Sequence, residues 1–236
     1  MPKLVKGANF VTIEDTKDLS EEELADLITN WMEQTFTKRV SHLNILVNSK
    51  FSTEIDLLLM EHGFNKHDEV ITVHKELIDE SNESPNTFKD LHTISEEEFM
   101  ATWEQVMTGS LNPSSLKIEE QMESVKIELG SSYKESCILA YEGGKPIGVT
   151  IPHIEAGTLE EGRIFYFGLI PEERGKGKSI LLHRQTLGLL KSKFGAIFYI
   201  GNTSHKNIPM LHTFRKNGCK VLEKNKVYKK YFLYQS

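Results

Sequence analysis

The residues with the clearest chemical potential lie at positions 171–182, where the sequence reads PEERGKGKSILL. Two glycines, three cationic side chains and a serine occupy positions 174–179. Glycine allows positive φ and close backbone approach to a ligand. A helix that begins after such a turn presents unpaired N–H groups and partial positive charge. The pattern predicts a site for an anion such as a diphosphate, and a solvated basic helix start is the alternative interpretation.

Two common nucleotide-binding motifs do not fit this turn. A P-loop, GxxxxGK[ST], would need a glycine where the chain has Glu172, and the dinucleotide fingerprint GxGxxG would need one where it has Ile180. Both motifs therefore fail on a required glycine, which disfavours a nucleotide hydrolase.

The segments around the turn predict the elements that position it. Residues 163–170, RIFYFGLI, are apolar on both faces, which predicts a central strand, and residues 179–194 predict the following amphipathic helix. A hairpin is expected at 137–151 around Gly143 and Gly144. After the helix we expect a strand at 196–200, a helix at 207–217 between Asn207 and Gly218, and a strand at 227–234.

The first third of the chain predicts a smaller unit. A capping box at Ser20 and Glu23 begins a helix at 20–36, and a strand at 43–47, a helix at 53–62 and a strand at 69–77 follow. The polar stretch 79–86 is the best linker candidate. Beyond it we expect a strand at 88–94, a second capping-box helix from Ser95 and a helix at about 113–129. The expected domains are therefore 1–85 and 86–236.

An internal repeat is a further possibility. Residues 54–64 align with 209–219 at an offset of 155, which places Gly63 on Gly218 and Lys75 on Lys230. The two capping-box helices align at an offset of 75. If both offsets hold, the N-terminal copy would contain segments that match the beginning and the end of the C-terminal copy, and would lack the segments between them. Chance similarity between two helix-to-strand segments is the alternative.

Composition excludes several classes of function. The chain has 236 residues, 39% hydrophobic residues and a net charge of −6, which disfavours nucleic-acid binding. No apolar run suits a signal peptide or a membrane span. Cys137 and Cys219 lie in apolar runs without metal-ligand spacing, so we expect reduced thiols and no metal. A soluble, cytoplasmic protein is expected.

Residues 86–236 resemble a GNAT N-acetyltransferase domain. The family's turn signature, usually PxxRGxGxG, is present with Ser179 in place of the final glycine. Its later Asn–helix–Gly motif is also present, with a cysteine where that motif has an aromatic residue. The matching positions are Pro171, Arg174, Gly175, Gly177, Ser179, Asn207, Gly218 and Cys219. The resemblance implies an α/β fold with a mixed α+β sheet, the GNAT acyltransferase fold, with a smaller N-terminal GNAT-like unit left from a second domain.

The resemblance also implies an activity. It implies transfer of an acetyl group from the cosubstrate acetyl-CoA to a primary amine of a small molecule or peptide, by direct attack and without a metal. The backbone N–H of Leu169 would stabilise the oxyanion. The cofactor-binding residues would be Leu169, Ile170, Arg174, Gly175, Lys176, Gly177, Lys178, Ser179, Asn202 and Asn207. Asn207 could instead simply cap its helix.

Proton transfer is left open by the sequence. Phe214 stands where many family members have a proton-donating tyrosine, and residues 163–170 contain no carboxylate to act as base. Tyr166, His153 and Glu155 are the candidates nearest in sequence, and core packing or a solvated loop would also explain them. A non-catalytic acyl-CoA-binding or interaction module is the rival hypothesis. The acceptor amine is not identified, and the chain could be a monomer or a homodimer.

Overall fold

The computed structural model of the chain describes residues 2–6, 10–31, 40–78, 86–111 and 116–232. It divides into two compact units, Met1–Thr72 with Leu222–Ser236, and Val73–Val221. The linker expected at 79–86 lies outside the described residues except for Asn86. The sequence-based domain boundaries, 1–85 and 86–236, stay a prediction.

The larger unit is built on a mixed sheet whose hydrogen-bonded order is β9-β8-β7-β6-β5. These strands are β5 (Thr87–Asp90), β6 (Ile138–Glu142), β7 (Lys145–Ile154), β8 (Glu161–Leu169) and β9 (Phe198–Ser204). β5 to β8 pair antiparallel, and β8 and β9 are parallel. Gly143 and Gly144, both at positive φ, form the hairpin turn between β6 and β7, as predicted.

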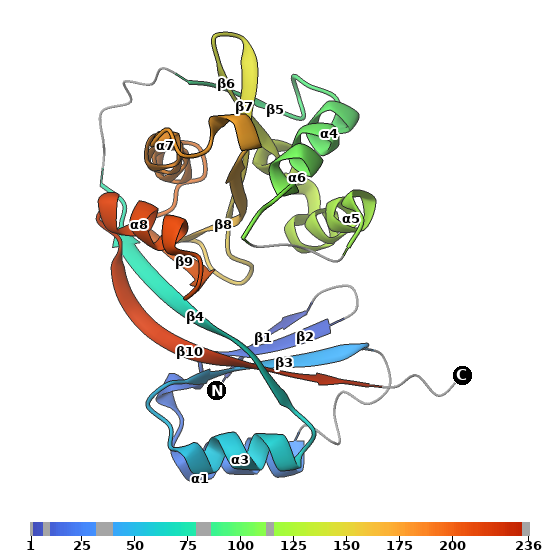
Figure 1. Cartoon of the computed structure of the whole chain (residues 1–236), viewed down its shortest axis with the longest axis vertical. Coiled ribbons are helices and arrows are strands. Elements are labelled where there is room, and N and C mark those ends of the chain that lie inside the picture. The colour runs from blue at the N-terminus through green and yellow to red at the C-terminus, as the bar shows by residue number, and fades with distance from the viewer. Residues whose placement is uncertain (1, 7–9, 32–39, 79–85, 112–115, 233–236) are drawn as a thin grey trace. The chain divides into compact units, whose positions relative to one another are not determined.

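Helices cover both faces of this sheet (Figure 1). On one face lie α4 (Glu96–Met107), α5 (Ile118–Leu129) and the short α6 (Tyr133–Ser136), and α7 (Lys178–Ser192) and α8 (Ile208–Lys216) lie on the other. Ser95 caps α4 by accepting the Glu98 N–H. Phe99, Trp103 and Val106 of α4 share one helical face and are fully buried against the sheet.

The smaller unit has the strand order β1-β2-β3-β10-β4. Its elements are β1 (Lys3–Lys6), β2 (Phe10–Glu14), α1 (Glu21–Asp26) followed by a π-helical segment (Leu27–Trp31), β3 (His42–Asn48), α3 (Thr53–Glu61), and most of β4 (Asn65–Glu76) and β10 (Lys220–Tyr231). Residues 73–76 of β4 and 220–221 of β10 belong to the larger unit. The predicted capping box is present, since Ser20 Oγ accepts from Glu23 N–H and Glu23 Oε2 accepts from Ser20 N–H.

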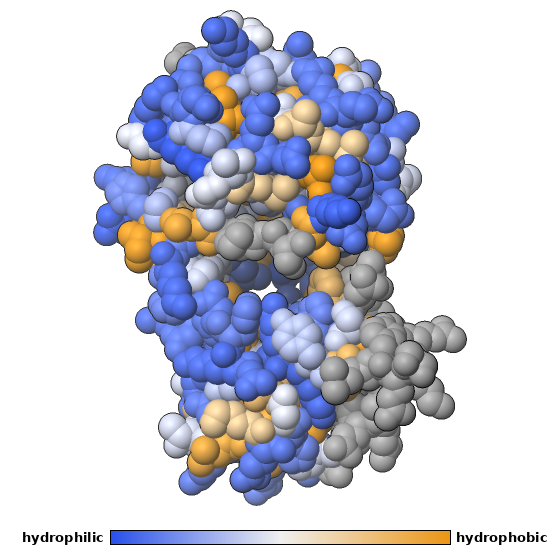
Figure 2. Space-filling view, turned by 45° about the vertical axis from the view of Figure 1, so that its right-hand side comes forward, coloured by the Kyte–Doolittle hydropathy of each residue, from blue (hydrophilic) through white to orange (hydrophobic). Residues whose placement is uncertain are grey.

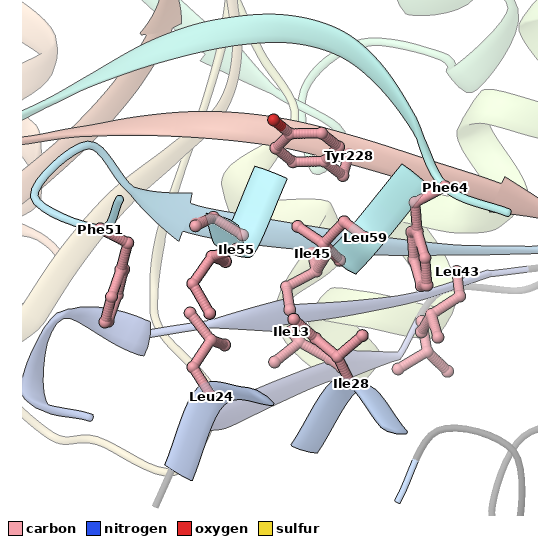
Figure 3. Close-up of a cluster of buried hydrophobic side chains, with 12 residues drawn as sticks. Ile13, Leu24, Ile28, Leu43, Ile45, Phe51, Ile55, Leu59, Phe64 and Tyr228 are labelled. Atoms are coloured by element: carbon pink, nitrogen blue, oxygen red, sulfur yellow. The ribbon is translucent and has the colours of Figure 1, made fainter. Parts of the chain in front are cut away.

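The core of the smaller unit draws on distant parts of the sequence (Figure 3). Ile13 and Ile45 from the sheet meet Leu24 and Leu59 from the helices, and all four are fully buried. Tyr228 of β10 lies in the same cluster with 1% of its surface exposed. Each such side chain contributes about 1.5–3 kcal/mol through burial. The end of the chain therefore stabilises its beginning.

The repeat is confirmed, and its phase differs from the prediction. Three pairs of equivalent elements begin 155 positions apart in the two copies. They are the short 3-10 turns that begin at Thr16 and Pro171, the helices α3 and α8 that begin at Thr53 and Ile208, and the strands β4 and β10 that begin at Asn65 and Lys220. Moreover, β2–α1–β3 is a parallel crossover like β8–α7–β9. The helix after Ser20 is therefore the counterpart of α7, and its expected match to the helix after Ser95 is wrong. The first copy keeps the second half of the fold and lacks the first half.

The last strands of the two copies are exchanged. β10 pairs antiparallel with β3, while β4 is the neighbour of β9. The aligned glycines and lysines follow the same exchange: a Cβ on Gly63 would lie 3.9 Å from Lys230 Cε, and one on Gly218 would lie 3.8 Å from Lys75 Nζ. Both glycines have positive φ and end a helix, which is why each copy has glycine there.

The face drawn in Figure 2 is mostly hydrophilic, with apolar side chains in separate small groups. None of the helices in the described part of the chain has the length and apolar composition of a membrane-spanning helix.

Candidate functional site

The centre of the candidate site is strand β8, which carries a β-bulge. Its register with β7 shifts by one residue, so that Ile151 faces both Phe165 and Tyr166. These two consecutive side chains consequently pack into the same apolar cluster beneath α4 and α5. A bulge bends the strand that contains it and is typical of functional sites.

β8 separates from β9 shortly before this bulge. The two strands pair at Glu161 with Phe198 and at Gly162 with Tyr199, and the pairing stops there although both strands continue. The facing edges of residues 163–169 and 200–204 therefore diverge. Backbone N–H and C=O groups along such an edge need hydrogen-bond partners. The opening suits an extended, amide-rich ligand that can bond like an added strand.

The direction of the β8 N–H groups follows from its pairing with β7. Ile170 N–H donates to Ile147 O at 3.0 Å, and Ile170 O accepts from Glu173 N–H. Ile170 is therefore used within the protein, which corrects its prediction as a ligand donor. Because successive residues of a strand point to opposite edges, the N–H groups of Leu169 and Phe167 face the opening. Sequence reasoning missed Phe167, although its place two residues before Leu169 was a usable signal.

The glycine turn at the end of β8 has the predicted conformation. Gly175 and Gly177 have φ of 73° and 75°, and Gly177 is the N-cap of α7 without a capping side chain. Arg174 N–H donates to Pro171 O, and the next backbone bond of the described turn is Ile180 N–H to Gly177 O. The N–H groups of residues 175–179 lie between these bonds. Residues 175–177 are exposed, so the amides are accessible to an anion.

The side chain of Arg174 has a different role from the predicted one. Its guanidinium donates to Leu169 O at 3.0 Å, to Thr108 O at 2.8 Å and to Val106 O at 2.6 Å. It therefore satisfies carbonyls at the C-terminal end of α4 and ties them to the end of β8. Arg174 positions the turn, and its charge is not directed to an anion.

The two lysines of the turn are engaged with carboxylates. Lys178 Nζ lies 2.6 Å from Glu173 Oε2 and also contacts Glu142 Oε2, and Lys176 Nζ lies 3.2 Å from Glu173 Oε2. Hydrogen bonds from Lys178 and Lys176 lower the pKa of Glu173, and hydrogen bonds to Glu142 and Glu173 raise the pKa of Lys178. Glu173 and Lys178 are therefore both charged near neutral pH.

The remaining predicted ligand residues lie around the opening. Ser179 Oγ is 3.1 Å from Thr213 Oγ1, and so links α7 to α8. Asn207 Oδ1 accepts from Met210 N–H, so Asn207 caps α8, as the alternative interpretation held. Asn202 is an exposed residue of β9 beyond the last β8 pair.

Phe214 of α8 is buried. Its ring packs 5.4 Å from the ring of His183 and 6.3 Å from that of Tyr199. Burial lowers the pKa of His183 to about 3, so this imidazole is neutral at physiological pH. Asn217 contacts its Nδ1 at 2.9 Å. His183 is thus a buried packing residue.

Tyr166, a predicted catalytic candidate, lies on β8 three residues before Leu169. Its ring lies 5.1 Å from that of Trp103, and a Cβ on Gly168 would be 3.8 Å from its hydroxyl oxygen. Burial, the largest influence, raises its pKa. The phenol is therefore protonated at neutral pH and suits a proton donor better than a base.

His153 and Glu155 lie at the other end of the sheet. Glu155 Oε2 is 3.3 Å from Arg163 Nε and 3.8 Å from His153 Nε2. Glu155 N–H bonds to Glu161 O, and Glu161 is eight residues before Leu169. At 3.3 Å per residue this is roughly 26 Å along β8. Glu155 is therefore too far from Leu169 to accept a proton from an amine that reacts there. The Glu155 carboxylate also forms an ion pair with Arg163.

The first copy lacks both features of this site. Its parallel pair stays closed from Phe10 with His42 through Ile13 with Ile45. At the repeat offset, residues 174–179 correspond to 19–24, LSEEEL, which contain three glutamates and no glycine. The N-terminus of α1 is occupied by its own capping box. An anion would meet like charge and engaged donors there.

Comparisons with known proteins identify the fold. No protein-family model matches the chain, and no curated protein matches its sequence. Among solved structures, it is similar to a GCN5-related N-acetyltransferase from Sphaerobacter thermophilus, with 17% identity, a TM-score of 0.64, and coverage of 98% of this chain and 76% of the other.

Two further structures agree. A tandem GNAT protein from the clavulanic acid biosynthesis pathway has 11% identity and a TM-score of 0.56, over 98% of this chain and 78% of the other. A GCN5-related N-acetyltransferase from Kribbella flavida has 12% identity and a TM-score of 0.55, over 97% and 89%. Together with the bulged, diverging β8 and its glycine turn, these likenesses show that the chain has the GNAT fold, in a two-unit form with a shorter N-terminal copy.

Proposed function

We propose that the chain is an acyltransferase that moves the acetyl group of acetyl-CoA to a primary amine of a small molecule or peptide. The observation that carries the proposal is that the open edge of β8 leads directly into the glycine turn. One extended ligand with amides along its length and a diphosphate at its end matches both features.

In this reaction, residues of the chain would bind the cosubstrate, stabilise the oxyanion and supply a proton. Acetyl-CoA supplies an acyl group activated as a thioester. The N–H groups of residues 175–179 hold its diphosphate, and the edge of β8 holds its amide-rich arm. The N–H groups of Phe167 and Leu169 stabilise the negative charge that develops on the carbonyl oxygen when the amine attacks. The phenol of Tyr166 holds a proton for the leaving thiolate, in the role that Phe214 cannot fill.

A binding module without catalysis is the second candidate, because Phe214 has no proton to give and Glu155 is paired with Arg163. Release of free thiol from acetyl-CoA, measured with a broad panel of amines, distinguishes the two. We expect turnover with at least one amine, and a lower rate without loss of CoA affinity in Tyr166→Phe. CoA binding without turnover across the panel would establish the binding module instead.

The closed first copy predicts the stoichiometry of binding. Its paired β2 and β3 and its acidic, capped helix start leave one CoA site in each chain. Calorimetric titration with CoA should give one site per chain. A second site of comparable affinity would contradict this assignment of the first copy.

A further inference from the structure

The three cationic side chains of the turn differ in whether they can bind an anion. Arg174 is committed to three backbone carbonyls, so a bound diphosphate can gain charged partners in the turn only from Lys176 and Lys178. Both ammonium groups contact the same oxygen, Oε2 of Glu173. Glu173 thus pairs with both lysines, and Glu142 Oε2 also contacts Lys178.

Glu173 is well placed to compete with a ligand. It ends the 3-10 turn Pro171–Glu173, two residues before Gly175, and its carboxylate contacts the side chains of Lys176 and Lys178. Its side chain is 19% exposed, against 53% for Lys176. A diphosphate that used either ammonium group would have to replace this carboxylate.

We propose that Glu173 is an internal competitor for the diphosphate of CoA and thereby sets the affinity of the site. This inference rests on the proposed function. The carboxylate neutralises part of the charge of the two ammonium groups when no anion is bound, and ligand binding exchanges one anionic partner of the lysines for another. The net gain from the lysines is consequently small, and the backbone amides supply most of the binding.

The test is the affinity of Glu173→Gln for CoA, measured by calorimetry in the full chain. Exposed ion pairs contribute modestly, so we expect binding about three- to tenfold tighter than in the wild type. Glu172→Gln is the matched control, because Glu172 is an exposed neighbour and its loss changes the net charge equally. Dephospho-CoA should show the same gain, which separates the diphosphate from the 3′-phosphate as the group involved.

A double-mutant cycle isolates the competition. When Lys176 and Lys178 are both replaced by Gln, Glu173→Gln should no longer change the affinity, because no ammonium group is left to release. Unchanged or weaker binding by Glu173→Gln in the wild-type background would overturn the proposal while leaving the CoA site intact. A gain equal to that of Glu172→Gln would also overturn it. If the wild type did not bind CoA, the proposed function and this inference would both fail.

Discussion

Gly177→Asp is expected to weaken CoA binding at least about 100-fold while the fold is kept. The new carboxylate would stand at the start of α7, where it would accept from helix N–H groups and repel the diphosphate. Like charges brought together at a binding site cost several kcal/mol, and each 1.4 kcal/mol is a tenfold change in affinity. Calorimetry gives the affinity, and circular dichroism with thermal unfolding reports the fold.

The control for this substitution lies at the other end of the same helix. Gly195 has φ of 77°, against 75° at Gly177, and a Cβ at either residue would meet no atom within 4 Å. Gly195→Asp therefore has the same backbone strain and the same added charge, away from the turn. It should bind CoA like the wild type. Wild-type affinity in Gly177→Asp would show that the turn does not hold the diphosphate.

Tyr228→Ala is expected to destabilise the smaller unit by about 3–5 kcal/mol, the usual cost of removing a buried aromatic ring. Tyr228 is 1% exposed within a cluster formed by β2, β3, α1 and α3. Hydrogen exchange followed by mass spectrometry should show faster exchange in β3 and α3. This measurement suits a chain of two units better than one unfolding midpoint, because two-state behaviour is not assured.

Tyr231→Ala is the matched control, since Tyr231 lies on the same strand and is 65% exposed. It should change the exchange of β3 much less. If Tyr228→Ala left β3 and α3 as protected as in the wild type, the contribution of β10 to this core would be refuted.

Local chemistry could be predicted from the sequence, whereas pairing between distant segments could not. Gly175 and Gly177 predicted the positive-φ turn correctly, because glycine is the residue that adopts positive φ without steric cost. Arg174 was misassigned because its partners, Val106 and Thr108, are more than 60 residues away in sequence. The bulge opposite Ile151 depends on strand register, which the apolar pattern of residues 163–170 does not reveal.

The phase of the repeat was misjudged for a similar reason. Ser20 and Ser95 have the same capping signature, but such a signature marks only where a helix begins. The parallel pairing of β2 with β3 is what identifies the helix after Ser20 as the counterpart of α7. Gly63 and Gly218, aligned at 155, gave the correct phase because both end a helix that leads into a strand.

The exchanged last strands determine the order in which the protein can be built during translation. β3 ends at Asn48, yet its neighbour β10 begins at Lys220. While the ribosome synthesises the intervening chain, the edge of β3 stays open, and the N-terminal segment cannot mature first as N-terminal domains ordinarily do. Such long-range closure is slow and leaves an unpaired strand exposed to other nascent chains until β10 has been synthesised.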